Sequence, residues 1–379
     1  MEHALCRQVL RIFDQTGLPL QRNSHVFATN GARVDLSMEP VHLLMSSAAR
    51  DSCGQAMDKL VRNRRLFVTT LPPDGLPALD EKQLSSVNVA FFSRDLHRTP
   101  SPGGNESARA FFKAALQAPR LRWTQIFFVG IDDVPVLGRL MAKGVDVTTA
   151  TGAGSDAIAQ SVIAAVLAIS RGFLHHISAK NRKHWNPLAV HAEPPPIRGQ
   201  QVTIVGLGPI GREVSRLLKV FGPRIVGISR SGDKVDFCDC NLRYADLATV
   251  LPTTNWLVLA CPLTELTRRL IDKTAIDMLP RGARIINVAR GAILDEAALI
   301  EALRSGHLTA AYLDVFSQEP LPSESPLWTM DNVLISPHTA GARSDYDANV
   351  QSIFLENLVR FCDGLPLLNS VNPAMQQSG

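Results

Sequence analysis

The chain lacks the features that mark a membrane or secreted protein. Its 379 residues contain no apolar stretch near the ~18 residues needed to cross a bilayer, and the most apolar run, Ala157–Ile169, is interrupted by Gln160 and Ser161. The N-terminal segment is charged throughout and has no apolar signal core. We therefore expect a cytoplasmic protein without a membrane partner.

The chain also has little excess charge and no metal-binding cysteine pattern. Lysine and arginine exceed aspartate and glutamate by only four, too little over this length to indicate a nucleic-acid partner. The six cysteines form no CxxC pair, and Cys238 and Cys240 are poorly spaced for tetrahedral zinc. These patterns predict reduced thiols and no metal site.

What the chain does have is an alternation of short apolar runs with helix-length segments, without internal repeats. Such alternation is typical of parallel sheets covered by helices on both faces. The proline-rich segment Glu193–Gly199 is predicted to separate a first series of runs from a second. The predicted strands are Leu66–Thr70, Val87–Phe92, Trp123–Val129, Val145–Thr149, Val202–Val205, Arg224–Ile228, Trp256–Ala260, Arg284–Val288, Ala310–Leu313 and Val333–Ile335.

The intervening segments have helical periodicity. Val214 begins a stripe with i, i+3, i+4, i+7 spacing, and Asp295 is suited to cap a helix that ends at Gly306. We expect an α/β protein of two doubly wound parallel-sheet domains. Residues 1–155 and 343–379 would form one of these domains, of flavodoxin-like type, and residues 156–342 the other, of Rossmann type.

A phosphate-binding loop is predicted where the strand Val202–Val205 ends. Gly206, Gly208 and Gly211 form a GxGxxG pattern, with Pro209 and Ile210 between the second and third glycines, and an amphipathic helix follows. The glycines allow a tight turn, close approach of a pyrophosphate and close helix packing. The amide groups and the dipole at the helix start favour phosphate.

The next strand ends at Ser229, followed by Arg230 and Ser231. NAD enzymes usually place an acidic residue here to accept hydrogen bonds from the ribose hydroxyls. Serine does not repel a 2′-phosphate, and Arg230 can pair with one. The sequence therefore predicts a preference for NADP(H), with NAD(H) still possible because arginine also stacks on adenine.

Three polar residues follow later strands. Arg290, Glu319 and His338 each come after a strand, at the edge where parallel α/β sheets bind ligands. Arginine can hold a carboxylate with two hydrogen bonds, and a glutamate beside a histidine favours and orients the imidazolium. Together with a nicotinamide, these residues suit the reduction of a 2-oxo acid.

Long segments of the second half resemble the D-isomer-specific 2-hydroxyacid dehydrogenases. The matching segments are VGLGPIGREVSRLLKVFG, CPLTELTRRLID, INVARGAILDEAALIEAL, LDVFSQEPLP and ISPHTAG, whereas residues 1–120 show little similarity. The resemblance implies that Arg290 binds the substrate carboxylate, that His338 is the acid/base and that Glu319 is its partner. It also implies a homodimer formed through the nucleotide-binding domains.

The resemblance assigns further residues to the cofactor and the substrate. Asp314 would contact the nicotinamide carboxamide, and Val129 and Gly130 would bind the substrate carboxylate through backbone N–H groups. The residues expected to line the cofactor are Cys261, Pro262, Thr267 and Val288.

The leading interpretation is a reductase of glyoxylate, hydroxypyruvate or a similar 2-oxo acid. One alternative is another dehydrogenase of the same family, such as phosphoglycerate dehydrogenase. A second is a nucleotide-sensing protein like the corepressors that share this fold, since these keep the three polar residues. Formate oxidation is disfavoured because Glu319 stands where the formate enzymes carry glutamine.

Overall fold

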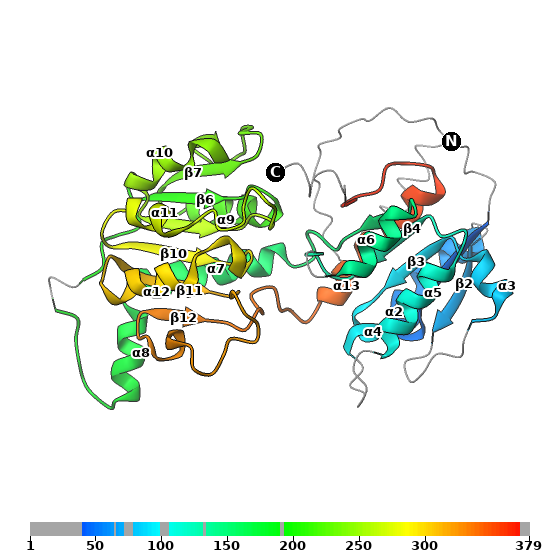
Figure 1. Ribbon diagram of the computed structural model, residues 1–379, viewed down its shortest axis with the longest axis horizontal. Coiled ribbons are helices and arrows are strands. Elements are labelled where there is room, and N and C mark those ends of the chain that lie inside the picture. The colour runs from blue at the N-terminus through cyan, green and yellow to red at the C-terminus, as the bar shows by residue number, and fades with distance from the viewer. Residues whose placement is uncertain are drawn as a thin grey trace. The chain divides into compact units, whose positions relative to one another are not determined.

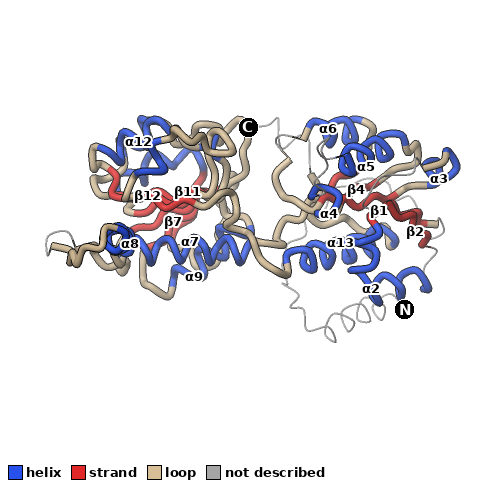
Figure 2. The backbone as a smooth tube through the Cα atoms, turned by 90° about the horizontal axis from the view of Figure 1, so that it is seen from below, coloured by secondary structure: helices blue, strands red, loops and turns tan. Residues whose placement is uncertain are grey.

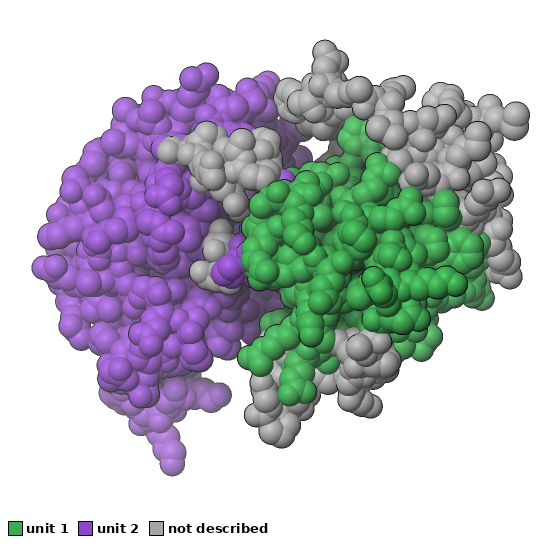
Figure 3. All heavy atoms as spheres, turned by 45° about the vertical axis from the view of Figure 1, so that its right-hand side comes forward, with its two compact units in different colours: residues 1–127, 136–149, 350–370 green, residues 128–135, 150–349, 371–379 purple. Residues whose placement is uncertain are grey.

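A computed structural model describes residues 40–63, 66–71, 79–98, 106–131, 134–189 and 193–371. Its contacts divide the chain into two compact units (Figures 1 and 3). Unit 1 comprises the described residues within Met1–Phe127, Val136–Thr149 and Val350–Ser370. Unit 2 comprises those within Phe128–Pro135, Ala150–Asn349 and Val371–Gly379. The proline- and glycine-rich segment 99–105 and the N-terminal segment lie outside the described residues.

Unit 1 contains a five-stranded sheet in the order β2-β1-β3-β4-β5, with every pair of neighbours parallel. This is the flavodoxin-like order expected for a doubly wound sheet. The strands are β1 (Val41–Ser46), β2 (Leu66–Leu71), β3 (Val89–Phe92), β4 (Trp123–Ile126) and β5 (Asp146–Thr148).

Helices cover both faces of the unit 1 sheet (Figure 2). They are α2 (Ser47–Asn63), α3 (Glu81–Ser86), α4 (Arg94–Arg98), α5 (Glu106–Gln117), α6 (Pro135–Ala142) and α13 (Tyr346–Cys362). An apolar stripe of α13 is buried, and the ring of Phe354 stacks on Phe91 with centroids 4.2 Å apart. The C-terminal helix therefore belongs, from Val350 on, to the core of unit 1.

Unit 2 contains a seven-stranded parallel sheet in the order β12-β11-β10-β9-β6-β7-β8. The chain starts at β6, winds outward through β7 and β8, and then continues on the other side of β6 with β9, so the topological switch point lies between β6 and β9. The strands are β6 (Gln201–Val205), β7 (Arg224–Ser229), β8 (Cys240–Arg243), β9 (Trp256–Leu259), β10 (Ala283–Asn287), β11 (Leu308–Leu313) and β12 (Val333–Ile335).

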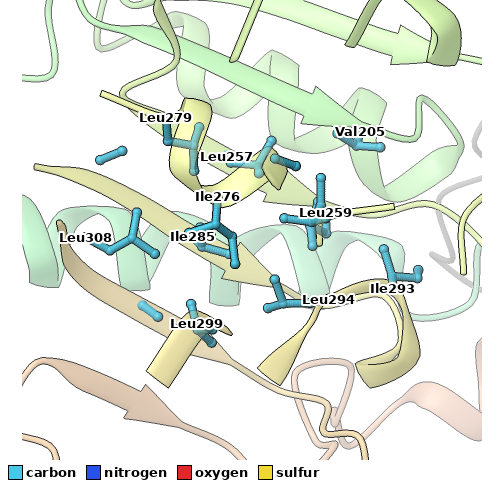
Figure 4. Packing of buried hydrophobic residues seen from close by; sticks show 14 of the residues in the cluster. Val205, Leu257, Leu259, Ile276, Leu279, Ile285, Ile293, Leu294, Leu299 and Leu308 are labelled. Carbon is cyan, nitrogen blue, oxygen red and sulfur yellow. The ribbon is translucent and has the colours of Figure 1, made fainter. Parts of the chain in front are cut away.

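Successive residues of the unit 2 strands pack on opposite faces. Leu257 and Leu259 belong to one buried cluster with α11 and α12 (Figure 4), whereas Trp256 and Val258 belong to another with α7 and α9. This two-sided burial explains the continuous apolar runs. The helices are α7 (Ser155–Ser170), α8 (Phe173–Asn181), α9 (Pro209–Lys219), α10 (Leu247–Val250), α11 (Lys273–Met278) and α12 (Glu296–Arg304).

The predicted α/β class and parallel sheets are confirmed, and so are the predicted helix ends. The Asp295 side chain accepts a hydrogen bond from the backbone nitrogen of Ala298 and caps α12, and Gly306 follows with φ +68°. The segment Glu193–Gly199 does separate the two series of strands, but its interpretation as the boundary between the two parts of the chain is wrong. It lies inside unit 2, between α8 and β6.

Among the described residues, no single helix has the length and apolar character needed to cross a membrane; α7 and α8 meet the criterion only as a pair bent by 73°.

Candidate active site

The predicted phosphate loop joins β6 to α9 at the carboxyl edge of the unit 2 sheet. Gly206 has φ +101°, and a methyl group on its Cα would lie 2.5 Å from the backbone nitrogen of Cys261, across the switch point. A methyl group at Gly211 would lie 1.9 Å from the carbonyl oxygen of Gly206. Both positions therefore require glycine, because the chain passes too close to its neighbours for a Cβ atom.

The second glycine of the loop faces open space. No described atom lies within 4 Å of a methyl group built on Gly208, which is exposed. Pro209 and Ile210 begin α9, and none of the described side chains caps the amide groups of this helix start. The open space, the uncapped amides and the helix dipole fit the pyrophosphate of a dinucleotide.

The turn after β7 has no carboxylate at the strand end. The hydroxyl oxygen of Ser229 accepts a hydrogen bond of 3.0 Å from the backbone nitrogen of Gly232. The carbonyl oxygen of Ser231 accepts one of 3.1 Å from Nε of Arg243, at the end of the neighbouring strand β8. The side chain of Arg230 is exposed. The turn is thus polar and cationic.

The residues expected to line the cofactor follow β9 and β10. Burial raises the pKa of the Cys261 thiol to about 12, although a hydrogen bond with Tyr244 opposes the shift. The hydroxyl of the buried Thr267 donates to the carbonyl oxygen of Pro262 at 2.7 Å and closes the turn after β9. Val288 is buried directly after β10. All of these residues lie in unit 2, on loops that leave the same edge of the sheet.

The structure brings Glu319 and His338 together. Nδ1 of His338 lies 2.7 Å from Oε2 of Glu319, and Oε1 of Glu319 accepts a hydrogen bond of 3.0 Å from the backbone nitrogen of Phe316. The backbone contact fixes the carboxylate, and the carboxylate fixes the imidazole ring. The side chain of His338 is 49% exposed and that of Glu319 is 36% exposed, so the imidazole ring is accessible to a ligand.

Asp314 holds the loop that carries His338. Its Oδ1 accepts hydrogen bonds from the Ser336 hydroxyl at 2.5 Å and from the backbone nitrogens of Thr339 and Ala340 at 2.8 and 2.9 Å. His338 itself has φ +54°, and its backbone nitrogen donates to the carbonyl oxygen of Asp314 at 2.8 Å. A non-glycine residue in this conformation is held by its surroundings, so Asp314 positions the loop in addition to any contact with a cofactor.

Arg290 lies against the predicted substrate loop. A methyl group on Gly130 would lie 1.4 Å from Nη2 of Arg290, so the guanidinium rests on the glycine backbone. Nη1 of Arg290 donates to the carbonyl oxygen of Ala289 at 2.7 Å. Val129, the neighbour of Gly130, is exposed. The predicted carboxylate-binding residues thus meet in unit 2.

Gly291, which is not among the predicted site residues, connects this region to Glu319. A methyl group on Gly291 would lie 1.9 Å from the backbone of Phe316, whose nitrogen binds Glu319. The turn after Arg290 therefore packs directly on the segment that orients the carboxylate. The only signal in the sequence was a glycine directly after an arginine at a strand end.

The arrangement offers a guanidinium for an anion, an imidazole–carboxylate pair for proton exchange and a loop for a dinucleotide. Such a fold and site define an NAD(P)-dependent oxidoreductase of hydroxy and oxo acids. The family model described as "D-isomer specific 2-hydroxyacid dehydrogenase, NAD binding domain" matches residues 163–340. A glyoxylate reductase of Aeropyrum pernix is 35% identical over 265 residues, which cover 68% of this chain and 78% of that protein. The chain belongs to the D-isomer specific 2-hydroxyacid dehydrogenase family.

Solved structures of the family superpose on most of the chain. A D-isomer specific 2-hydroxyacid dehydrogenase from Xanthobacter autotrophicus Py2, in complex with NADPH and MES, is 30% identical with a TM-score of 0.72 and covers 89% of this chain and 100% of its own. An NADPH-dependent glyoxylate/hydroxypyruvate reductase from Sinorhizobium meliloti, in complex with NADP and sulfate, is 25% identical with a TM-score of 0.67. It covers 88% of this chain and 98% of its own.

Proposed function

We propose that this dehydrogenase works as an NADPH-preferring reductase of a small 2-oxo acid of the glyoxylate or hydroxypyruvate type. The observation that carries the proposal is the 2.7 Å contact between His338 and Glu319 on the sheet edge that also carries Arg290. Two proteins similar to this chain also support the proposal: one is a glyoxylate reductase, and the other is an NADPH-dependent glyoxylate/hydroxypyruvate reductase.

In this proposal Arg290 holds the substrate carboxylate, aided by the backbone N–H groups of Val129 and Gly130. The guanidinium also stabilises negative charge that develops on the carbonyl oxygen. A nicotinamide held by the loops of unit 2 would supply a hydride to C2 of the 2-oxo acid. His338 then gives a proton to the forming alkoxide oxygen, and Glu319 stabilises the imidazolium before that transfer and keeps the ring oriented.

The proposed cofactor residues form three groups along the carboxyl edge of the unit 2 sheet. The loop after β6 would hold the pyrophosphate, the turn after β7 the adenosine ribose and its 2′-phosphate, and the loops after β9, β10 and β11 the nicotinamide half. The residues concerned are Gly206, Gly208, Pro209, Ile210, Gly211, Ser229, Arg230, Ser231, Cys261, Pro262, Thr267, Val288 and Asp314.

The preference for NADPH rests on the turn after β7. A carboxylate at the position of Ser229 would repel a 2′-phosphate, whereas serine is neutral. The exposed Arg230 supplies a cation next to it. NAD(H) would bind the same loops with fewer charged contacts.

We propose that residues 1–155 and 343–379 recognise the part of the substrate that differs between 2-oxo acids.

We also propose a homodimer formed through residues 156–342. Helix α8 and the segment after it present exposed apolar side chains: Phe173 is 53%, Ile177 49% and Trp185 95% exposed. A second copy of this chain is the occupant we propose for this surface, because Phe173 and Ile177 lie one helical turn apart and exposed apolar patches mark protein interfaces. Sedimentation of the wild type and of Trp185→Ser tests it: a dimer weakened by the substitution supports the proposal, and a monomeric wild type contradicts it.

The substrate is tested by following nicotinamide absorbance with purified protein. The panel contains glyoxylate, hydroxypyruvate, pyruvate and 3-phosphohydroxypyruvate, each with NADPH and with NADH. We expect the highest kcat/KM for glyoxylate or hydroxypyruvate with NADPH, and a D-configured product from hydroxypyruvate. A clear preference for 3-phosphohydroxypyruvate would favour phosphoglycerate dehydrogenase. No turnover of any 2-oxo acid would contradict the proposal.

A further inference from the structure

Arg243 lies beside the turn that follows β7, although it is distant from it in sequence. It is the last residue of β8 and the direct register partner of Ser229 on β7. Its Nε donates a hydrogen bond of 3.1 Å to the carbonyl oxygen of Ser231. The guanidinium is therefore held at Ser231, one of the three residues that would surround the adenosine ribose.

The backbone of the turn is shaped around this side chain. Gly232 has φ +72°, and a methyl group there would lie 3.0 Å from Cγ of Arg243. The nitrogen of the same glycine donates to the hydroxyl oxygen of Ser229. Glycine is thus suited to this position both by its conformation and by its contact with the arginine. The stem of Arg243 has a fixed place under the turn, while the residue as a whole is exposed.

The charge of Arg243 is not neutralised within the part of the chain that the structure describes. Its guanidinium forms no ion pair with a described carboxylate, and its side-chain hydrogen bond goes to a neutral carbonyl oxygen. Two acidic residues lie nearby in sequence: Oδ2 of Asp246 accepts a hydrogen bond from the backbone nitrogen of Arg243, and Asp233 is exposed on the turn, where water surrounds it. Arg230 contributes a second positive charge from the turn itself.

We propose that Arg243 is a second cation of the 2′-phosphate site and determines cofactor specificity together with Arg230. Nε keeps the Ser231 carbonyl in place, and the Nη atoms bind phosphate oxygens. Two guanidinium groups on one phosphate allow several charge-assisted hydrogen bonds, which are stronger than neutral ones. The inference rests on the proposed preference for NADPH and deepens it by naming a residue from a different strand.

The test measures binding of adenine nucleotides without the reaction. Calorimetry compares 2′,5′-ADP, which carries the 2′-phosphate, with 5′-AMP, which differs from it only in lacking that phosphate. For Arg243→Gln we expect the affinity for 2′,5′-ADP to fall about 10- to 150-fold, the range of one charge-assisted hydrogen bond, with little change for 5′-AMP. Arg243→Lys should restore part of the loss because it keeps the charge. Arg224→Gln, at the opposite end of β7, is the matched control and should change neither ligand.

The outcomes separate this inference from the proposed function. If the wild type favours 2′,5′-ADP and Arg243→Gln leaves that preference intact, Arg243 has no part in specificity while the NADPH preference stands. If Arg243→Gln weakens both ligands equally, the residue only supports the turn, and the inference is wrong. If the wild type binds the two ligands equally, the proposed cofactor preference is itself wrong and the inference falls with it.

Discussion

The guanidinium of Arg290 occupies the space that a side chain on Gly130 would fill. A methyl group on Gly130 would lie 1.4 Å from Nη2 and 2.6 Å from Cζ of Arg290. The obstacle is the far end of a flexible side chain, so a substitution at Gly130 would displace the guanidinium more readily than the backbone. The contact ties the position of the proposed carboxylate-binding group to a residue 160 positions earlier in the chain.

Gly130→Ala should therefore damage activity while leaving the fold intact. We expect kcat/KM for glyoxylate to fall by about 10²-fold, the scale of misplacing a positioning group by an ångström, with an unchanged Tm. Gly138→Ala in α6 is the matched control, because no described atom lies within 4 Å of a methyl group there. It should keep full activity. Equal activity of the two variants would contradict the role of the contact.

Arg290→Lys tests whether the guanidinium binds the substrate carboxylate. Lysine keeps the charge but loses the planar pair of donors, so KM for 2-oxo acids should rise sharply and kcat should fall. A 2-oxo aldehyde, which has no carboxylate, should be affected much less. Steady-state kinetics with glyoxylate and methylglyoxal give the comparison. If both substrates lose the same factor, Arg290 acts on the structure of the site and not on the carboxylate.

His338→Gln tests the proton transfer. Glutamine fills a similar space and its amide can still donate a hydrogen bond to Glu319, but it cannot transfer the required proton. We expect kcat to fall by about 10²–10⁴-fold, the usual contribution of general acid catalysis, while the Kd for NADPH, measured by fluorescence, stays nearly constant. Turnover close to that of the wild type would remove His338 from the mechanism.

The buried thiol of Cys261 predicts a dependence of stability on alkaline pH. Burial raises its pKa from 9.0 to about 12 in the folded chain. When the pH rises above about 9, the unfolded chain releases this proton first, so the free energy of unfolding falls between about pH 9 and 12. Between about pH 8 and 10.5, the free energy of unfolding of Cys261→Ala should therefore fall by about 1–2 kcal/mol less than that of the wild type. Guanidinium unfolding at both pH values measures this, and identical losses would contradict the assignment.

Much of the fold could be predicted because its strands are buried on both faces. Ten strands were expected from apolar runs, and each has a counterpart in the structure. Strand β8 was missed because Cys240–Arg243 is a short, partly exposed edge strand without an apolar pattern. Strand β1, Val41–Ser46, does form an apolar run, but this strand, which lies between β2 and β3 in the sheet, was not predicted.

The candidate site was predictable as a set of motifs but not as a set of contacts. The order of strands explains why Arg290, Glu319 and His338 share one sheet edge. No pattern in the sequence could show that Gly291 packs on Phe316, or that β8 places Arg243 opposite Ser229. Such contacts depend on the pairing of strands and on loop conformations, which local periodicity does not encode.

The preference for NADPH in the reduction of a 2-oxo acid is the central claim, and one comparison tests it most directly. kcat/KM is measured with glyoxylate for NADPH and NADH in the wild type and in the double variant Ser229→Asp, Arg230→Ala. The wild type should favour NADPH by about 10- to 150-fold, the value of one charge-assisted hydrogen bond. The double variant should favour NADH, because it regains a ribose acceptor and loses a phosphate partner. A wild type that favours NADH, or a double variant that loses both cofactors equally, would contradict the account.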